Sequence, residues 1–240
     1  MFESKKILPK GSKKLINAWA FYDWANSVYA LVISSAIFPI YYAALFSENN
    51  IINFLGYEVK NTAMISFVTG TAFLVVAFIS PLLSGIADFV GNKKNFMQFF
   101  VYLGSTSCVG LYWFDLDNLY LGLLFYFLAI IGIWASLVFY NSYLPDVAFP
   151  EQQDRASARG FSMGYIGSVL LLLLNLSMVM MPEAYGIGGS AGEAAMQAMR
   201  YSFVSVGIWW LGFSQVSFYF LPKGNKNDEK VTMILFGMVL

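Results

Sequence analysis

The sequence predicts an all-α polytopic membrane protein in which six transmembrane helices form one bundle, with the N- and C-termini cytoplasmic. Hydrophobic residues make up 58% of the 240 residues and charged residues only 12%, which leaves too little polar surface for a soluble domain of this size. Six stretches are apolar over the length of about 20 residues that a helix needs to cross the bilayer core. The positive charges lie in segments that would share one side of the membrane.

The chain divides into a basic cytoplasmic arm (1–17), the transmembrane bundle (18–222), and a polar linker with an apolar tail (223–240). The tail is too short to span, and we interpret it as a truncated seventh helix, with an interfacial tail as the alternative. Uninterrupted stretches of this length are too long for barrel strands. The spans are predicted, in chain order, at about 18–46, 61–86, 96–114, 119–141, 160–181 and 201–221.

The placement of Lys and Arg predicts the orientation. All of them except Lys60 and Arg200 fall in the arm, in the loops after the second and fourth spans, or in the tail. Cytoplasmic segments carry such an excess of positive charge. Six spans also return the chain to the side on which it starts, so both termini are expected in the cytoplasm.

The composition excludes several kinds of site. The chain has no His and a single Cys, Cys108, which excludes imidazole metal sites, thiolate clusters and an intrachain disulfide. No phosphate-binding loop or nucleophile–base pattern is present. We therefore expect no enzyme activity, no metal and no cofactor. The expected partners are the lipid bilayer and a small polar solute, and no nucleic acid. The basic arm could touch anionic headgroups, although its simplest role is to set the topology.

An acid, Asp23, interrupts the first span. An unpaired acid at the centre of a spanning helix costs roughly 2.5–3.5 kcal/mol, so it usually faces a partner or a polar interior. Asn26 is three residues away on the same helix face, and Tyr22 flanks it. Two interpretations remain open: an interfacial residue paired with Lys13 or Lys14, and a group that lines a pathway for solute or protons.

The fourth span ends on the same side with Tyr140 and Asn141, which places their side chains at the depth of Asp23. Arg159, just before the fifth span, is a plausible ionic partner for Asp23. The plain alternative for Asn141 is a helix cap ahead of Pro145.

Two further patterns concern loops and packing. Asp88, Gly91 and Lys93 form a tight charged turn after the second span, in which Gly91 permits a positive φ. The fifth span contains small residues at close spacing, which favour close helix packing and carry no information on substrate. These residues are Gly160, Gly164 and Gly167.

The turn after the second span resembles a degenerate copy of the signature loop of the major facilitator superfamily. Ala87, Asp88, Gly91 and Lys93 match that signature, whereas Ser84, Phe89 and Asn92 depart from it. The resemblance implies that Asp88 helps to latch two six-helix halves in one state, with Gly91, Lys93 and Arg159 as further gating candidates.

Three stretches are more specific and resemble the branch related to the autophagy-linked vacuolar amino-acid effluxers, which has bacterial members. They are 22–27, 140–145 and 164–167. The resemblance covers the N-terminal half of a twelve-helix architecture and implies alternating access. The second half would be a missing C-terminal half or a second copy in a homodimer. The span-four arginine and the span-five glycine–proline motif of many relatives are absent.

The resemblance thus implies a secondary transporter that exports or exchanges small polar solutes, with amino acids the leading class, in a bacterial cytoplasmic membrane. Asp23, Asn26, Tyr22, Tyr140 and Asn141 are the candidates for binding solute or a proton. The alternative is a non-transporting six-helix scaffold or degenerate half-transporter, which would show Asp23 in a salt bridge with no cavity beside it.

Overall fold

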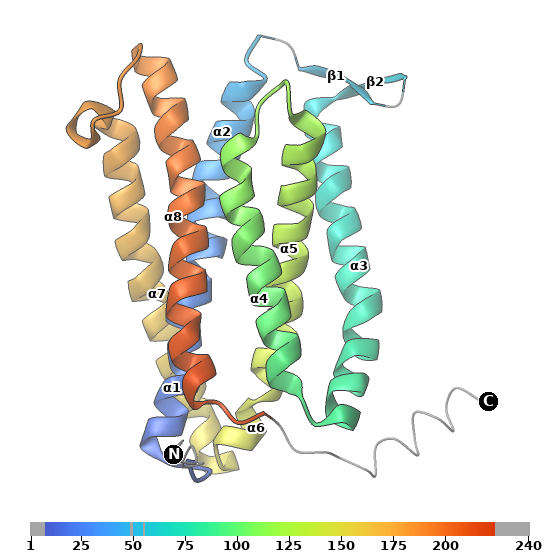
Figure 1. Cartoon of the computed structure of the whole chain (residues 1–240), viewed down its shortest axis with the longest axis vertical. Helices are drawn as coiled ribbons and strands as arrows, with labels where there is room; N and C mark the ends of the chain where they lie inside the picture. Colours follow the sequence, from blue (N-terminus) through green and yellow to red (C-terminus); the bar gives the residue numbers. More distant parts are fainter. Residues whose placement is uncertain (1–7, 49, 55, 224–240) are drawn as a thin grey trace, which may run out of the picture.

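The computed structural model describes residues 8–48, 50–54 and 56–223, apart from the side chains of residues 86 and 88–90. The apolar tail predicted within 223–240 lies outside these residues from 224 on. Six long helices run along the long axis of the molecule (Figure 1). The first is continuous through α1 (Lys13–Val28), η1 (Tyr29–Ile37) and α2 (Phe38–Leu45). The others are α3 (Asn61–Val90), α4 (Lys93–Gly110), α5 (Leu119–Ser142), α7 (Pro150–Met180) and α8 (Ala191–Phe220).

Five of these helices are long and apolar enough to cross a membrane, counted over the residues that the structure describes. The exception is α4, so the predicted span at 96–114 is not among them. α4 has 18 residues and ends at Gly110, where the 3₁₀ turn η2 (Leu111–Trp113) follows. Its Ser105 and Ser107 hydroxyls donate to carbonyls of the preceding turn. These polar residues lower the hydropathy of α4 while they remain satisfied within it.

The fifth and sixth helices begin earlier than the predicted spans. α7 starts at Pro150 rather than near 160, and α8 starts at Ala191 rather than near 201. Proline at the first helical position is pre-organised for a helix. Ser190 and Glu193 form a capping box that starts α8. Both helices therefore extend into polar sequence that hydropathy alone excludes.

A β-hairpin between the first two long helices was not predicted. β1 (Ile51–Phe54) pairs with β2 (Tyr57–Lys60) in an antiparallel register that sets Phe54 opposite Tyr57. Gly56 takes a φ of 88° in the turn, a conformation that favours glycine. The hairpin lies at the end of the bundle opposite both described termini (Figure 1). We call that end the hairpin end, and the other, with the α3–α4 turn and α6 (Leu144–Val147), the basic end.

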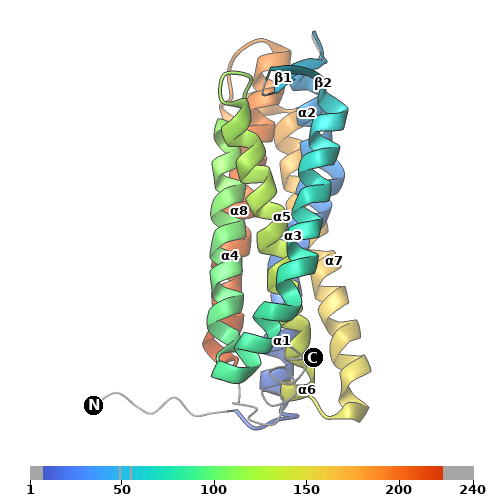
Figure 2. The ribbon, with the colours of Figure 1, turned by 90° about the vertical axis from the view of Figure 1, so that its right-hand side faces the viewer.

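The helices pack as a compact bundle with α3 and α7 on its outer flanks. α4 and α8 lie side by side, α5 packs against α4, and α1 packs against α8. α3 packs mainly on α5, and α7 packs mainly on α1 (Figures 1 and 2). The apolar windows of α3 and α7 are the least buried among the candidate spans. These two helices thus present apolar surface outward.

The first helix widens in its middle into the π-helical segment η1, which ends just before Pro39. Proline has no backbone N–H, and its ring clashes with the carbonyl four residues earlier in an α-helix. The wider segment accommodates that loss, and Ser35 Oγ donates to the carbonyl of Ala30 at 2.9 Å. The helix therefore consists of two α-helical parts, α1 and α2, on either side of η1.

Glycines bring α4, α5 and α8 into close contact. A Cβ atom built on Gly132 of α5 would lie 2.4 Å from Cα of Gly104 on α4. One built on Gly104 would lie 2.3 Å from the fully buried ring of Trp210 on α8. Small residues let helix backbones approach closely in membrane bundles.

Gly132→Ala is expected to destabilise the protein, because the new methyl group meets backbone rather than a movable side chain. Overpacking of this kind costs about 1–3 kcal/mol. Thermal unfolding in detergent, followed by tryptophan fluorescence, measures the effect. Gly212→Ala is the matched control, since a Cβ there has nothing within 4 Å. Equal unfolding midpoints for the two variants would contradict the contact.

Candidate functional site

A cluster of neutral hydrogen-bond donors surrounds the carboxylate of Asp23 at the junction of α1, α5 and α7. Asp23 is 8% exposed. The Tyr140 hydroxyl on α5 donates to Asp23 Oδ2 at 2.9 Å. Nδ2 of Asn26 lies 3.5 Å from Asp23 Oδ1 and donates to the carbonyl of Tyr22 at 3.1 Å. The ion pairs between described residues are Lys93–Asp146 and Arg200–Asp115. Asp23 therefore has no cationic partner among the described residues.

Aromatic rings hold Tyr140 in place. The Tyr22 ring centroid lies 5.0 Å from that of Tyr140, and the Tyr22 hydroxyl donates to Ser136 Oγ at 2.9 Å. Trp19 stacks on Tyr140 at 4.5 Å and donates its indole N–H to the Tyr140 carbonyl at 2.9 Å. Trp19 and Ser136 were not among the predicted site residues. Each lies four residues before one of them, on the same helix face, and that spacing could have identified both.

The three glycines of the fifth span face α1. A Cβ built on Gly160 would lie 2.4 Å from Asp23 Oδ2, and one on Gly164 would lie 2.4 Å from Ser27 Oγ. One on Gly167 would lie 3.0 Å from atoms of Trp24. Because these positions lack side chains, the backbone of α7 approaches α1 closely enough to cover the carboxylate.

The predicted pairing of Asp23 with Arg159 is wrong. Arg159 donates instead to Asn17 Oδ1. Neighbouring residues on a helix point about 100° apart, and it is Gly160 that faces Asp23. The side chain of Arg159 is therefore directed away from the carboxylate. The alternative partners, Lys13 and Lys14, make no ion pair with Asp23 either.

A small cavity of about 260 Å³ lies next to this cluster, between η1, the end of α1 and α7. Ser27, one helical turn after Asp23, lines it together with Ser35 and Ser168. Tyr165 contributes a further hydroxyl to the lining. Asn141 does not join the cluster: its side chain is exposed and makes no hydrogen bond with a described residue.

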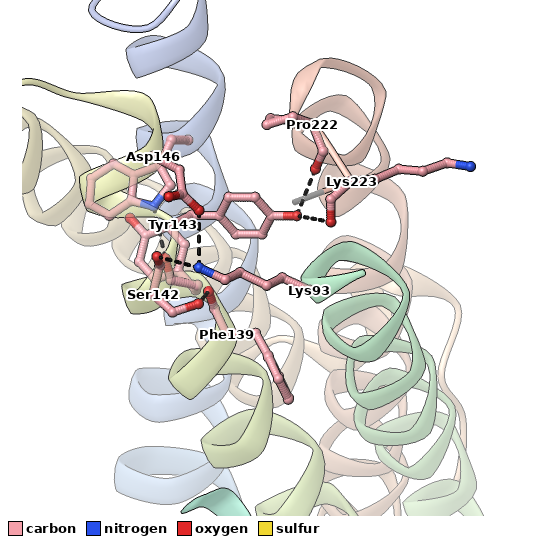
Figure 3. A network of polar contacts seen from close by, with 9 residues as sticks. Lys93, Phe139, Ser142, Tyr143, Asp146, Pro222 and Lys223 are labelled. Carbon is pink, nitrogen blue, oxygen red and sulfur yellow. Dashed lines mark hydrogen bonds and ion pairs between the residues drawn. The ribbon is translucent and has the colours of Figure 1, made fainter. Parts of the chain in front are cut away.

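A second polar network closes the basic end (Figure 3). Lys93 Nζ lies 3.1 Å from Asp146 Oδ2 of α6 and 3.4 Å from the Ser142 carbonyl. The Tyr143 hydroxyl donates to the Pro222 carbonyl at 2.7 Å. Lys94 Nζ donates to the backbone carbonyl of Leu221, and the backbone N–H of Lys94 donates to the backbone carbonyl of Lys223. The α3–α4 turn, the end of α5 and the segment after α8 are thereby joined.

Two predicted gating residues lie where α3 ends. Gly91 has a φ of 68° and caps α3, and its N–H donates to the carbonyl of Ala87. This left-handed conformation is the usual helix ending at glycine. Asp88 lies in the last turn of α3, but its side chain is outside the described residues.

Comparison with protein families matches residues 11–239 to the family described as "Vacuole effluxer Atg22 like". The chain belongs to this family. The resemblance to the vacuolar effluxer branch, drawn from three short stretches, is confirmed.

Several curated proteins are similar to this Atg22-like chain. An uncharacterised MFS-type transporter of Bacillus subtilis, YxiO, is 33% identical over 81% of this chain and 43% of its own length. An uncharacterised protein of Aquifex aeolicus is 29% identical over 72% of this chain and 41% of its own length. Autophagy-related protein 22-2 of Aspergillus niger is 19% identical over 71% of this chain and 38% of its own length. The chain thus spans less than half the length of these relatives. No solved structure matches it.

Tyr140→Phe is expected to destabilise the protein, because a buried carboxylate oxygen loses its closest donor. Leaving such a group unsatisfied costs about 1–3 kcal/mol. Thermal unfolding in detergent gives the measurement. Tyr165→Phe serves as the control, since Tyr165 on α7 is 72% exposed and its hydroxyl should contribute little. The assignment fails if both variants unfold at the wild-type midpoint.

Proposed function

We propose that this chain forms one six-helix half of an MFS-type secondary transporter that moves small polar solutes by alternating access. Amino acids are the leading class of solute, and export or exchange is the proposed direction. Membership in the Atg22-like effluxer family and the similarity to an MFS-type transporter support the general activity. These relatives are transporters rather than enzymes, in agreement with the lack of a catalytic pattern in the sequence.

The buried carboxylate of Asp23 is the single observation that carries this proposal. Its donors, Tyr140 and Asn26, are neutral, so its charge is not cancelled by a permanent cation among the described residues. A carboxylate in such a setting can accept a proton or bind the amino group of a solute, since intramembrane acids commonly mark such pathways. The cavity one turn away has a mixed lining, in which Ser27 and Tyr165 lie beside apolar residues such as Phe161 and offer further polar groups.

A second half would complete the pathway. The chain matches about two fifths of the length of its relatives, which supports a continuation or a second copy as that half. The exposed apolar faces of α3 and α7 offer surface for it. Exposed residues there include Phe67, Phe78, Tyr165 and Leu173. We place the basic end in the cytoplasm of a bacterial cell, following the charge distribution.

The network at the basic end is proposed as a latch between conformations. Lys93 and Asp146 join elements that precede and follow the fourth long helix. Tyr143 and Lys94 add the segment after α8 to the same network. Gly91 would allow the tight turn that places Lys93, and Asp88 is kept as a candidate member by family resemblance. All of these contacts lie within this half, so a rearrangement of its helices at the basic end would break and reform them.

Asp23→Asn is expected to slow transport by about tenfold to a hundredfold, because a hydrogen bond to a charged group contributes about 1.5–3 kcal/mol. The amide keeps the size of the side chain and an acceptor for Tyr140. The measurement is counterflow of labelled amino acids in vesicles that contain the transporter with both halves. Asp117→Asn is the matched control, since Asp117 is exposed in the α4–α5 loop. Wild-type rates for Asp23→Asn, with normal insertion, would refute the role of Asp23.

Lys93→Gln is expected to change the apparent affinity for solute on one side of the membrane by up to about fivefold. A partly exposed ion pair stabilises the conformation in which it forms by about 0.2–1 kcal/mol. Lys223→Gln is the control, because Lys223 joins the network through its backbone carbonyl while its side chain points away (Figure 3). The latch proposal fails if the two variants behave alike.

A further inference from the structure

A groove of about 730 Å³ opens at the basic end between α1, α7 and α8, where the ends of α1 and α8 lie together (Figure 1). Its rim carries three cations, Lys13, Lys14 and Arg159. Its wall is apolar and includes Phe21, Met163 and Phe220. The groove is separate from the candidate site, because neither Asp23 nor Tyr140 lines it.

The cations of the rim are not neutralised by carboxylates. No acidic residue lines the groove, and the ion pairs between described residues are Lys93–Asp146 and Arg200–Asp115. An adjacent depression is lined by one acid, Glu151, together with the three cations Lys13, Arg155 and Arg159. Positive charge therefore remains in excess around the rim.

The cations are also held in place. Arg159 on α7 donates to Asn17 Oδ1 on α1, which fixes the guanidinium at the junction of the two helices. Lys14 Nζ lies 4.7 Å from the centroid of the Phe220 ring on α8, within the range of a cation–π interaction. Arg159 thus connects α7 to α1, and Lys14 connects α1 to α8.

We propose that this groove binds one anionic phospholipid of the cytoplasmic leaflet. Basic pockets between transmembrane helices on the cytoplasmic side bind anionic headgroups. The phosphate would lie between Lys14 and Arg159, and an acyl chain would run along Phe21, Met163 and Phe220. The apolar wall favours a lipid over a free anion, since inorganic phosphate has no group that could cover it. A bound lipid would connect α1, α7 and α8 at the end of the bundle that the latch also occupies.

The test measures lipid binding by the delipidated full chain in detergent, by native mass spectrometry with phosphatidylglycerol and with zwitterionic phosphatidylcholine. Lys14→Gln/Arg159→Gln is expected to weaken phosphatidylglycerol binding by about thirtyfold, since each cation near the surface contributes about fivefold. Lys60→Gln/Lys223→Gln removes the same charge outside the groove and is expected to bind as the wild type does. Phosphatidylcholine is expected to bind weakly to all three proteins.

Two results would overturn the proposal. Equal losses in the two double variants would assign the binding to diffuse surface charge. Full competition by inorganic phosphate at the concentration of the lipid would assign the groove to a free anion. Should the double variant not fold, Arg159→Gln alone tests the same site with an expected loss of about fivefold. Wild-type binding by that variant would also refute the site.

Discussion

The close contact between α1 and α7 determines where the polar groups of this bundle can lie. Gly160 and Gly164 carry no side chain, so the backbone of α7 lies against Asp23 and Ser27. The carboxylate is thereby kept from lipid without a cation, and its shortest hydrogen bond comes from Tyr140 on α5. A residue with a side chain at position 160 would occupy the space of the carboxylate itself. The polar cluster around Asp23 therefore depends on the close packing of α1 and α7.

Ionic and neutral polar contacts occupy different depths of the bundle. The ion pairs of the described residues lie near its ends, at Lys93–Asp146 and at Arg200–Asp115. Between these ends, the buried carboxylate of Asp23 accepts hydrogen bonds from a hydroxyl and an amide group. A desolvated ion pair repays the cost of burial only with excellent geometry, whereas neutral donors can separate from a carboxylate at a smaller cost. The central cluster is thus suited to exchange partners in the proposed transport cycle.

The sequence predicts the long apolar helices well because bilayer thickness requires them, and it predicts their ends poorly. Pro150 and Ser190 start helices in polar segments through local backbone chemistry that hydropathy does not register. The predicted depth of Asp23 and Tyr140 agrees with their contact, since depth follows from counting residues along a helix. Which residue Arg159 contacts depends on how α7 is rotated about its own axis. That rotation is set by glycine packing against α1, which a single sequence leaves open.

Carbodiimide labelling is the sharpest test of our proposal that Asp23 lies on the solute pathway. An apolar carbodiimide adds to carboxyl groups in apolar surroundings, and peptide mass spectrometry locates the adduct. In vesicles that contain both halves, we expect an adduct at Asp23 whose yield falls when a transported amino acid is present at saturation. A yield that does not change with any transported solute would contradict the claim and leave Asp23 with a role in helix packing.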